Sequence, residues 1–114
     1  MILHFKKDKF RKKKGGQARI YDIHCGKCQE FLFVYQKDGK GNLHRCYLNR
    51  ILAPAQWAKI EEDHSIRKAN DIPNLACPSC DEIVGVPIKR QDGRFCFRLK
   101  HGYFHKKYTK FKVE

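Results

Sequence analysis

The chain has 114 residues and carries 25 Lys or Arg against 12 Asp or Glu, which gives a formal net charge of +13 at neutral pH. This length suits one domain or two very small ones. No apolar run approaches the ~20 residues that cross a bilayer, and the first residues lack the apolar core of a secretory signal. We therefore expect a cytoplasmic protein with no membrane role.

The positive charge lies at the two ends of the sequence. Residues 1–19 hold eight basic residues and one acidic residue, and residues 94–114 hold seven and one, whereas residues 20–93 hold ten of each. Two basic ends on a neutral body are typical of a protein that holds a polyanion. Residues 1–18 are accordingly predicted to form a basic arm, with a hinge at Gly15-Gly16.

The body of the chain, residues 19–100, contains two pseudo-repeats at 19–50 and 73–100. Each reads Cys-x-x-Cys, one residue, Glu, an apolar strand, an Asp-Gly turn and a second strand that contains a cysteine. Asp-Gly between apolar runs is a hairpin signal. The pattern predicts a small, mostly-β (β-rich α+β) zinc-stabilised domain, in which two zinc-knuckle β-hairpins pack together.

The segment between the repeats favours one helix, at about residues 54–68. Pro54 suits the first turn of a helix, and the residues after it place Trp57 and Ile60 on one face, with Trp57 expected in the core. The residues from Asp71 to Asn74 are typical of a turn that leads into the second repeat.

Four of the six cysteines form two Cys-x-x-Cys pairs, Cys25 with Cys28 and Cys77 with Cys80. Two intervening residues let one tight turn direct both sulfurs at a single metal, so each pair supplies half of a tetrahedral site. The residues after each pair favour a strand, whereas a thioredoxin-like redox pair opens a helix. We predict one structural zinc ion held by all four thiolates; iron in the same four sulfurs stays open.

The other two cysteines, Cys46 and Cys96, lie in predicted strands. One interpretation makes them small hydrophobic packing residues. Another gives each half its own metal, using Cys46 with His44 or His24, and Cys96 with His101. A third makes them reactive thiols. We favour the shared metal, because the histidines do not occupy matching places in the two repeats.

Cations alternate with Tyr and Phe in the C-terminal segment, residues 101–114. Cations neutralise phosphates, and aromatic rings stack on unpaired bases. The sequence has no recognition-helix motif for reading a DNA groove, so RNA is favoured over DNA as partner, although the rings would equally suit a core with the lysines facing outward. The predicted nucleic-acid-binding residues are cations of both ends and one tyrosine: Lys6, Lys7, Lys9, Arg11, Lys12, Lys13, Lys14, Arg19, Arg98, Lys100, Lys106, Lys107, Tyr108, Lys110 and Lys112.

The two knuckles, each followed by a predicted hairpin, resemble the β-tent zinc folds, which include the yippee proteins, the thalidomide-binding domain of cereblon and methionine sulfoxide reductase B. The resemblance covers roughly residues 19–100 and implies an architecture. The segment Gly93–Cys96 also looks like the part of the reductase that carries its nucleophilic cysteine. The reductase's histidine-bearing stretch is replaced here by residues 83–88, and no Asn follows Cys96. In composition the chain is similar to small basic zinc-ribbon proteins of ribosomes and transcription machinery.

These observations predict a non-catalytic, zinc-stabilised nucleic-acid-binding protein, associated with RNA or a larger ribonucleoprotein complex, with no small-molecule substrate. One alternative is a protein-interaction adaptor whose β-tent groove holds a peptide or an acidic partner. The other is a thiol enzyme similar to methionine sulfoxide reductase, with Cys96 as its nucleophile.

Overall fold

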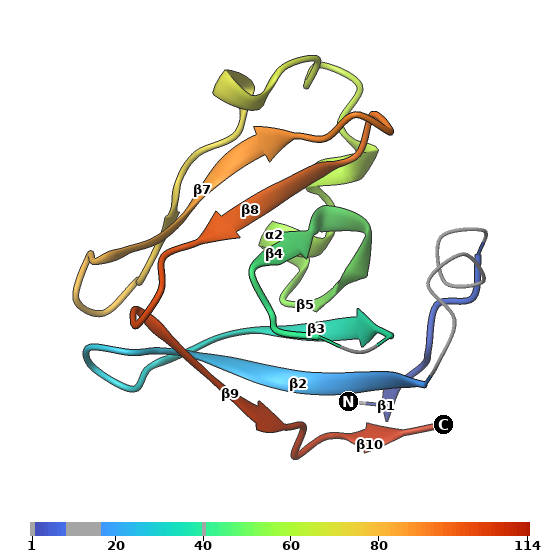
Figure 1. The fold of residues 1–114 in the computed structure, drawn as a ribbon, viewed down its shortest axis with the longest axis vertical. Helices are drawn as coiled ribbons and strands as arrows, with labels where there is room; N and C mark the ends of the chain where they lie inside the picture. The colour runs from blue at the N-terminus through green and yellow to red at the C-terminus, as the bar shows by residue number, and fades with distance from the viewer. Residues whose placement is uncertain (1, 9–16, 40) are drawn as a thin grey trace.

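Three β-sheets stack in layers in the computed structural model, which describes residues 2–8, 17–39 and 41–114 (Figure 1). The middle sheet has the strand order β5-β3-β2-β9, the upper sheet β4-β8-β7-β6, and β1 pairs with β10 below. The mostly-β fold predicted from the sequence is confirmed. The strands are β1 (Ile2–Leu3), β2 (Ala18–Cys25), β3 (Phe31–Asp38), β4 (Arg45–Tyr47), β5 (Ile51–Ala53), β6 (Leu75–Ala76), β7 (Ile83–Lys89), β8 (Phe95–Leu99), β9 (Phe104–Tyr108) and β10 (Lys112–Val113).

Both faces of the middle sheet are covered. On one face Phe33 joins Phe97 of the upper sheet in the main hydrophobic core, and both are fully buried. On the other face Val34 packs in a smaller cluster with Leu3 of β1. A strand buried on both faces needs apolar residues at successive positions, which explains the unbroken run Phe31–Tyr35.

The strand after the first Asp-Gly pair, β4, belongs to the upper sheet and does not pair with β3. The prediction of a hairpin at this Asp-Gly pair is therefore wrong. β4 pairs antiparallel with β8, with Cys46 opposite Phe97. β5 occupies the free edge of β3, with Val34 opposite Ala53, and therefore leaves β4 no place beside β3. The second Asp-Gly pair does close a hairpin, because β7 and β8 pair as far as Lys89 and Phe95.

The connecting helix is much shorter than predicted. It spans Ala55–Ala58 (α2), and two short 3-10 turns follow at Ile60–Glu62 and Ala69–Asp71. Past the first of these turns the Asp63 backbone is extended, and its carboxylate accepts hydrogen bonds from the backbone N–H and the hydroxyl of Ser65, at 2.9 and 2.7 Å, so the helix predicted as far as residue 68 does not resume. Such a local bond gives the backbone an alternative to helix.

Trp57 on α2 is partly buried and packs edge-on against Phe97, with 5.5 Å between the ring centroids. The short helix thus covers one end of the main core, as the sequence predicts for this residue. In the described part of the chain, no helix is long and apolar enough to span a bilayer.

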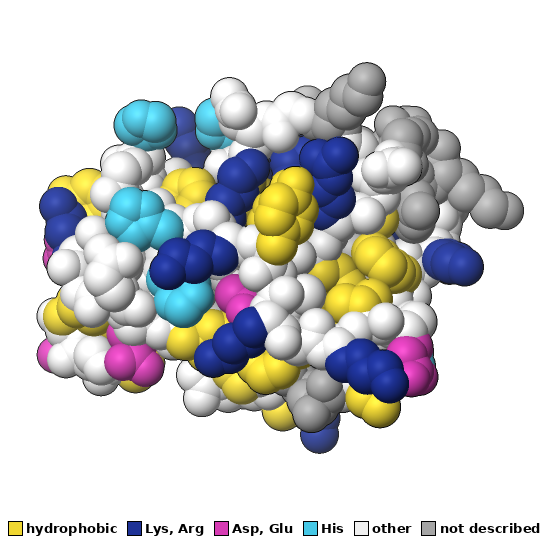
Figure 2. Space-filling model, turned by 90° about the horizontal axis from the view of Figure 1, so that it is seen from below, with side chains coloured by type: hydrophobic (Ala, Val, Ile, Leu, Met, Phe, Trp, Pro, Cys, Tyr) yellow, Lys and Arg dark blue, Asp and Glu magenta, His cyan; other side chains and the backbone are white. Residues whose placement is uncertain are grey.

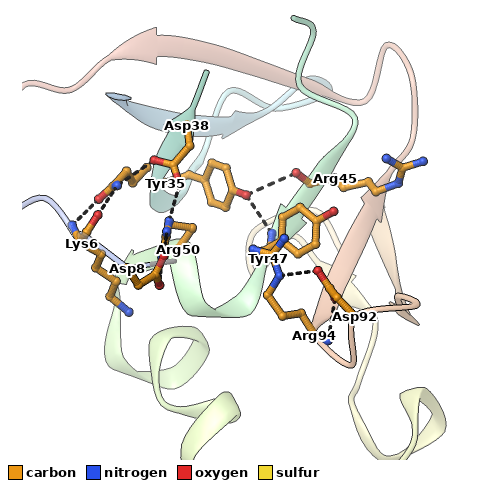
Figure 3. Close-up of polar contacts among 10 residues, drawn as sticks. Lys6, Asp8, Tyr35, Asp38, Arg45, Tyr47, Arg50, Asp92 and Arg94 are labelled. Carbon is orange, nitrogen blue, oxygen red and sulfur yellow. Dashed lines mark hydrogen bonds and ion pairs between the residues drawn. The ribbon is translucent and has the colours of Figure 1, made fainter. Parts of the chain in front are cut away.

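A polar network holds the described start of the chain against the end of β3 (Figure 3). Arg50 has a side chain only 2 % exposed; it donates to both oxygens of Asp8, at 2.6 and 2.9 Å, and to Asp38 at 2.8 Å. Gln36 donates to the carbonyl of Lys6 at 2.9 Å and accepts the backbone N–H of Lys6 at 2.6 Å. Together with the β1–β10 pairing, these contacts join the described N-terminal residues to the folded body.

The C-terminal basic segment also belongs to the sheets. β9 pairs antiparallel with β2, with Tyr108 opposite Tyr21 and Phe104 opposite Cys25. β10 pairs in parallel with β1. Five of the predicted arm residues lie outside the described residues, as does the predicted hinge: Lys9, Arg11, Lys12, Lys13 and Lys14.

Candidate metal centre and nucleic-acid interface

The two Cys-x-x-Cys motifs form equivalent tight loops at the ends of strand pairs. The first lies between β2 and β3, and the second between β6 and β7. In the first loop the Cys25 N–H donates to the Glu30 carbonyl at 2.8 Å; in the second the Cys77 N–H donates to the Glu82 carbonyl, also at 2.8 Å. The residue after each second cysteine has a positive φ, 70° for Gln29 and 63° for Asp81. The Cys-x-x-Cys part of the sequence repeat is therefore also a repeat in backbone geometry, although the strand pairings that follow differ in the two halves.

The four sulfurs of these loops meet between the middle and upper sheets. All four lie within 4.8 Å of one another. Across the two loops, Cys25 Sγ is 3.7 Å from Cys80 Sγ, and Cys28 Sγ is 3.5 Å from Cys77 Sγ. A tetrahedral zinc site with Zn–S bonds of about 2.3 Å has sulfurs about 3.8 Å apart. Both the donor set and the spacing therefore fit one metal ion shared by the two halves of the chain.

The thiols of this cluster influence one another's ionisation. Burial opposes ionisation of Cys25, but backbone N–H groups of Cys28 and Lys27 lower its pKa to about 7. The backbone N–H of Glu30 acts to lower the pKa of Cys28, but burial and the neighbouring thiols raise it to about 12. Four crowded thiols do not all ionise unaided, whereas a bound cation favours the thiolate at every one.

The first loop is also the point where the chain returns from the upper sheet. Gly26 donates its N–H to the carbonyl of Tyr103 at 2.8 Å, and a Cβ at this glycine would lie 2.7 Å from the carbonyl carbon of Tyr103. Gly26 is therefore required by a close approach of backbone, in addition to the turn itself. The Ser79 hydroxyl of the second loop donates to the Glu30 carboxylate of the first at 3.0 Å.

Cys46 and Cys96 lie apart from this cluster, on β4 and β8. Both are buried, at 0 % and 1 % exposed. Burial raises the pKa of both thiols, and at Cys96 it outweighs the effect of Arg45, Arg90 and Arg94. In the described part of the chain no second metal-type cluster forms around either cysteine.

The structure does not gather the predicted nucleic-acid-binding residues on one surface, and two of them lie together on β9. Lys106 and Tyr108 face the same side of β9, where the Tyr108 ring stacks on Tyr21 with 5.3 Å between centroids and 27° between planes. The ammonium group of Lys106 lies 4.9 Å from the Tyr21 ring. Tyr108 is 70 % exposed. On the face seen from below, Lys, Arg and His side chains are interspersed with hydrophobic ones (Figure 2).

Other predicted cations are placed elsewhere. Arg98 and Lys100 are exposed at the end of β8 on the upper sheet. Lys6 forms an ion pair with Glu61 at 3.7 Å. Lys112 pairs with Glu114 at 3.4 Å. The remaining described members of the predicted set are exposed: Lys7, Arg19, Lys107 and Lys110.

Sequence reasoning missed the arginines that accompany Arg98. Arg45 stands directly opposite Arg98 across the β4–β8 ladder, and Arg90 lines a surface groove together with these two arginines. The charge count over residues 20–93 concealed both, because that stretch is neutral as a whole. Arg45 could be placed beside Arg98 only by knowing that β4 pairs with β8. β4 has three residues, too few for its alternation of inward and outward side chains to reveal its partner strand.

Comparisons of the chain with protein-family models, with curated proteins and with solved structures each found no match. Its function is therefore inferred from its own residues.

Proposed function

We propose that this protein is a zinc-stabilised RNA-binding protein, associated with RNA or a ribonucleoprotein complex, that grips single strands on β9. The observation that carries the proposal is the ring of Tyr108. A tyrosine 70 % exposed that stacks on a second ring beside a lysine offers both contacts that a single strand needs. Stacking on the free ring face and neutralisation of a phosphate by Lys106 act together.

The proposed metal is a structural Zn²⁺ ion held by Cys25, Cys28, Cys77 and Cys80. The spacing of the four sulfurs supports a closed tetrahedral site, which leaves no open position for a substrate. We propose a β-tent type of architecture on the same ground, since one metal would join two knuckle-bearing sheets. The metal would hold the first loop in place, and through the Gly26–Tyr103 hydrogen bond it would fix the start of β9.

We propose a binding function without catalysis. A nucleophilic cysteine needs a lowered pKa and access to its substrate. Cys96 is 1 % exposed, and its burial raises its pKa. These properties suit a packing residue within the upper sheet.

The test is fluorescence anisotropy with a labelled single-stranded oligouridylate and the metal-loaded full chain. Tyr108→Ala should weaken binding by about 1–3 kcal/mol, the usual cost of one lost base stack, whereas Tyr108→Phe keeps the ring and should bind like the wild type. A single-stranded DNA of the matching sequence should bind less tightly. Failure of the wild type to bind RNA at low salt would overturn the proposal, and capture of an acidic peptide instead would favour the adaptor.

A further inference from the structure

A groove crosses the outer face of the upper sheet, on the side away from the main core. Its volume is about 910 Å³, and strands β4, β7 and β8 all contribute to its lining. The register places Arg45, Arg98 and Val86 in one row across these strands, because Arg98 is opposite both Arg45 and Val86. Residues opposite one another in antiparallel strands share a face of the sheet.

The lining of this groove is strongly cationic. It includes Arg45, Arg90, Arg98 and Lys100, and among the described residues no Asp or Glu lines it. Arg45 and Arg98 form no ion pair with any described carboxylate, and both are exposed. Figure 3 shows the Arg45 side chain extending away from the polar network around Arg50. Two like charges directly opposite in a sheet are destabilising, and a bound anion would relieve that repulsion.

The lining of the groove also includes apolar and aromatic residues. Val86, which is 38 % exposed, Ile88 and Tyr103 are all part of it. The Tyr103 ring lies under two ammonium groups, those of Lys100 at 4.0 Å and Lys27 at 4.5 Å. Guanidinium forks match phosphate oxygens, and apolar or aromatic surface suits an unpaired base. A nucleotide offers both kinds of group at once.

A second hollow joins this groove to β9. Its volume is about 470 Å³; it shares His44, Leu99 and His101 with the groove and extends to His105 and Lys106. Lys106 also lies over the Tyr21 ring beneath Tyr108. The cationic surface is therefore continuous from Tyr108 to the row of arginines.

We infer that this arginine groove is a second binding segment for the same single-stranded RNA, holding its phosphodiester backbone through Arg45 and Arg98. The inference rests on the proposed function, which it extends from one stacking contact to a path across two sheets. A strand stacked on Tyr108 would pass over Lys106 and the shared hollow, and then enter the groove.

The experiment compares Arg45→Ala/Arg98→Ala with the wild type, using the metal-loaded full chain and a labelled oligouridylate of about 12 nucleotides. Binding is titrated at several salt concentrations. Two lost phosphate contacts should reduce the slope of log K against log salt by about 1.4, and weaken binding about 25-fold at about 0.1 M salt. The matched control, Lys59→Ala/Arg67→Ala, removes the same charge from exposed positions in the segment between β5 and β6 and should leave the slope unchanged.

Each result decides between the two claims. If the groove variant keeps the wild-type slope while Tyr108→Ala weakens binding, the groove inference is wrong and the β9 proposal stands. If the groove and control variants lose affinity equally, the effect is one of net charge and the groove is again rejected. No RNA binding by the wild type overturns both. Equal metal content and circular dichroism spectra in all variants show that each is folded.

Discussion

Replacing Arg50 by Met should cost this protein a large part of its stability. The Arg50 side chain is 2 % exposed, and it makes charged hydrogen bonds to Asp8 and Asp38 at 2.6–2.9 Å. Burial opposes its charge, but the two carboxylates raise its pKa above the ordinary value, so Arg50 stays charged. Methionine keeps the packing of the apolar stem, so the variant isolates the loss of the guanidinium group, with its charge and its hydrogen bonds.

The size of the stability loss depends on which carboxylate partner of Arg50 is left buried without a counter-charge. Removing one member of a buried ion pair typically costs about 3–5 kcal/mol, because the other charge stays desolvated. Asp38 has a side chain 8 % exposed and would be stranded, whereas Asp8 is 39 % exposed and regains water. We therefore expect a loss near the lower end, about 3 kcal/mol, in the free energy of unfolding. Adding Asp38→Asn to Arg50→Met should restore part of it.

Urea denaturation of the metal-loaded protein, followed by circular dichroism, measures this loss. Arg67→Met is the control, because Arg67 is exposed and forms no ion pair with a described residue. The control should change stability by less than about 0.5 kcal/mol. A loss below about 1 kcal/mol in Arg50→Met would refute the argument, since it would show that water reaches Asp38 freely.

Three further outcomes are expected. Cys77→Ser, or chelation of the metal, should abolish the native circular dichroism spectrum, because both sheets meet at the four sulfurs; a native spectrum after verified metal loss would contradict this. Gly26→Ala should cost about 2–3 kcal/mol in urea denaturation, since its Cβ would lie 2.7 Å from backbone, whereas Ser79→Ala should cost about 1 kcal/mol for its one exposed hydrogen bond. Burial raises the pKa of Cys96, so its thiolate is scarcer at neutral pH than that of an ordinary cysteine. Peptide mass spectrometry should show slow iodoacetamide labelling of Cys96 at pH 7, and faster labelling only as the pH rises through and above the ordinary pKa of a cysteine. Rapid labelling at pH 7 would instead favour the thiol-enzyme alternative.

The parts of the structure set by local geometry could be predicted from the sequence. Two residues between cysteines fix a tight loop whatever surrounds it, so the pairs ending in Cys28 and Cys80 indicated a four-sulfur cluster before any strand was placed. The run Phe31–Tyr35 likewise predicted a strand, because aromatic and β-branched residues suit a pleated surface.

Long-range pairing could not be predicted from the sequence. The partner of β4 depended on β5 taking the edge of β3, a competition between segments that no local pattern records. Arg50 appeared as one more cation, because its burial depends on Asp8 arriving from a segment 42 residues away in the chain. The helix over 54–68 was overestimated: α2 ends at Ala58, and after the following 3-10 turn the Asp63 carboxylate accepts the backbone N–H of Ser65 in an extended stretch.

A metal at the four sulfurs would also act on the unfolded chain. Cys25 and Cys80 are 55 residues apart in sequence, so an ion held by both closes nearly half the protein into a loop. By the chain-entropy relation used for covalent cross-links, closing a loop of that length lowers the conformational entropy of the unfolded chain and so raises its free energy by about 4 kcal/mol. The ion would thus act as a reversible cross-link between the two loops. Its removal would release the middle sheet, the upper sheet and the segment between β5 and β6 from one another.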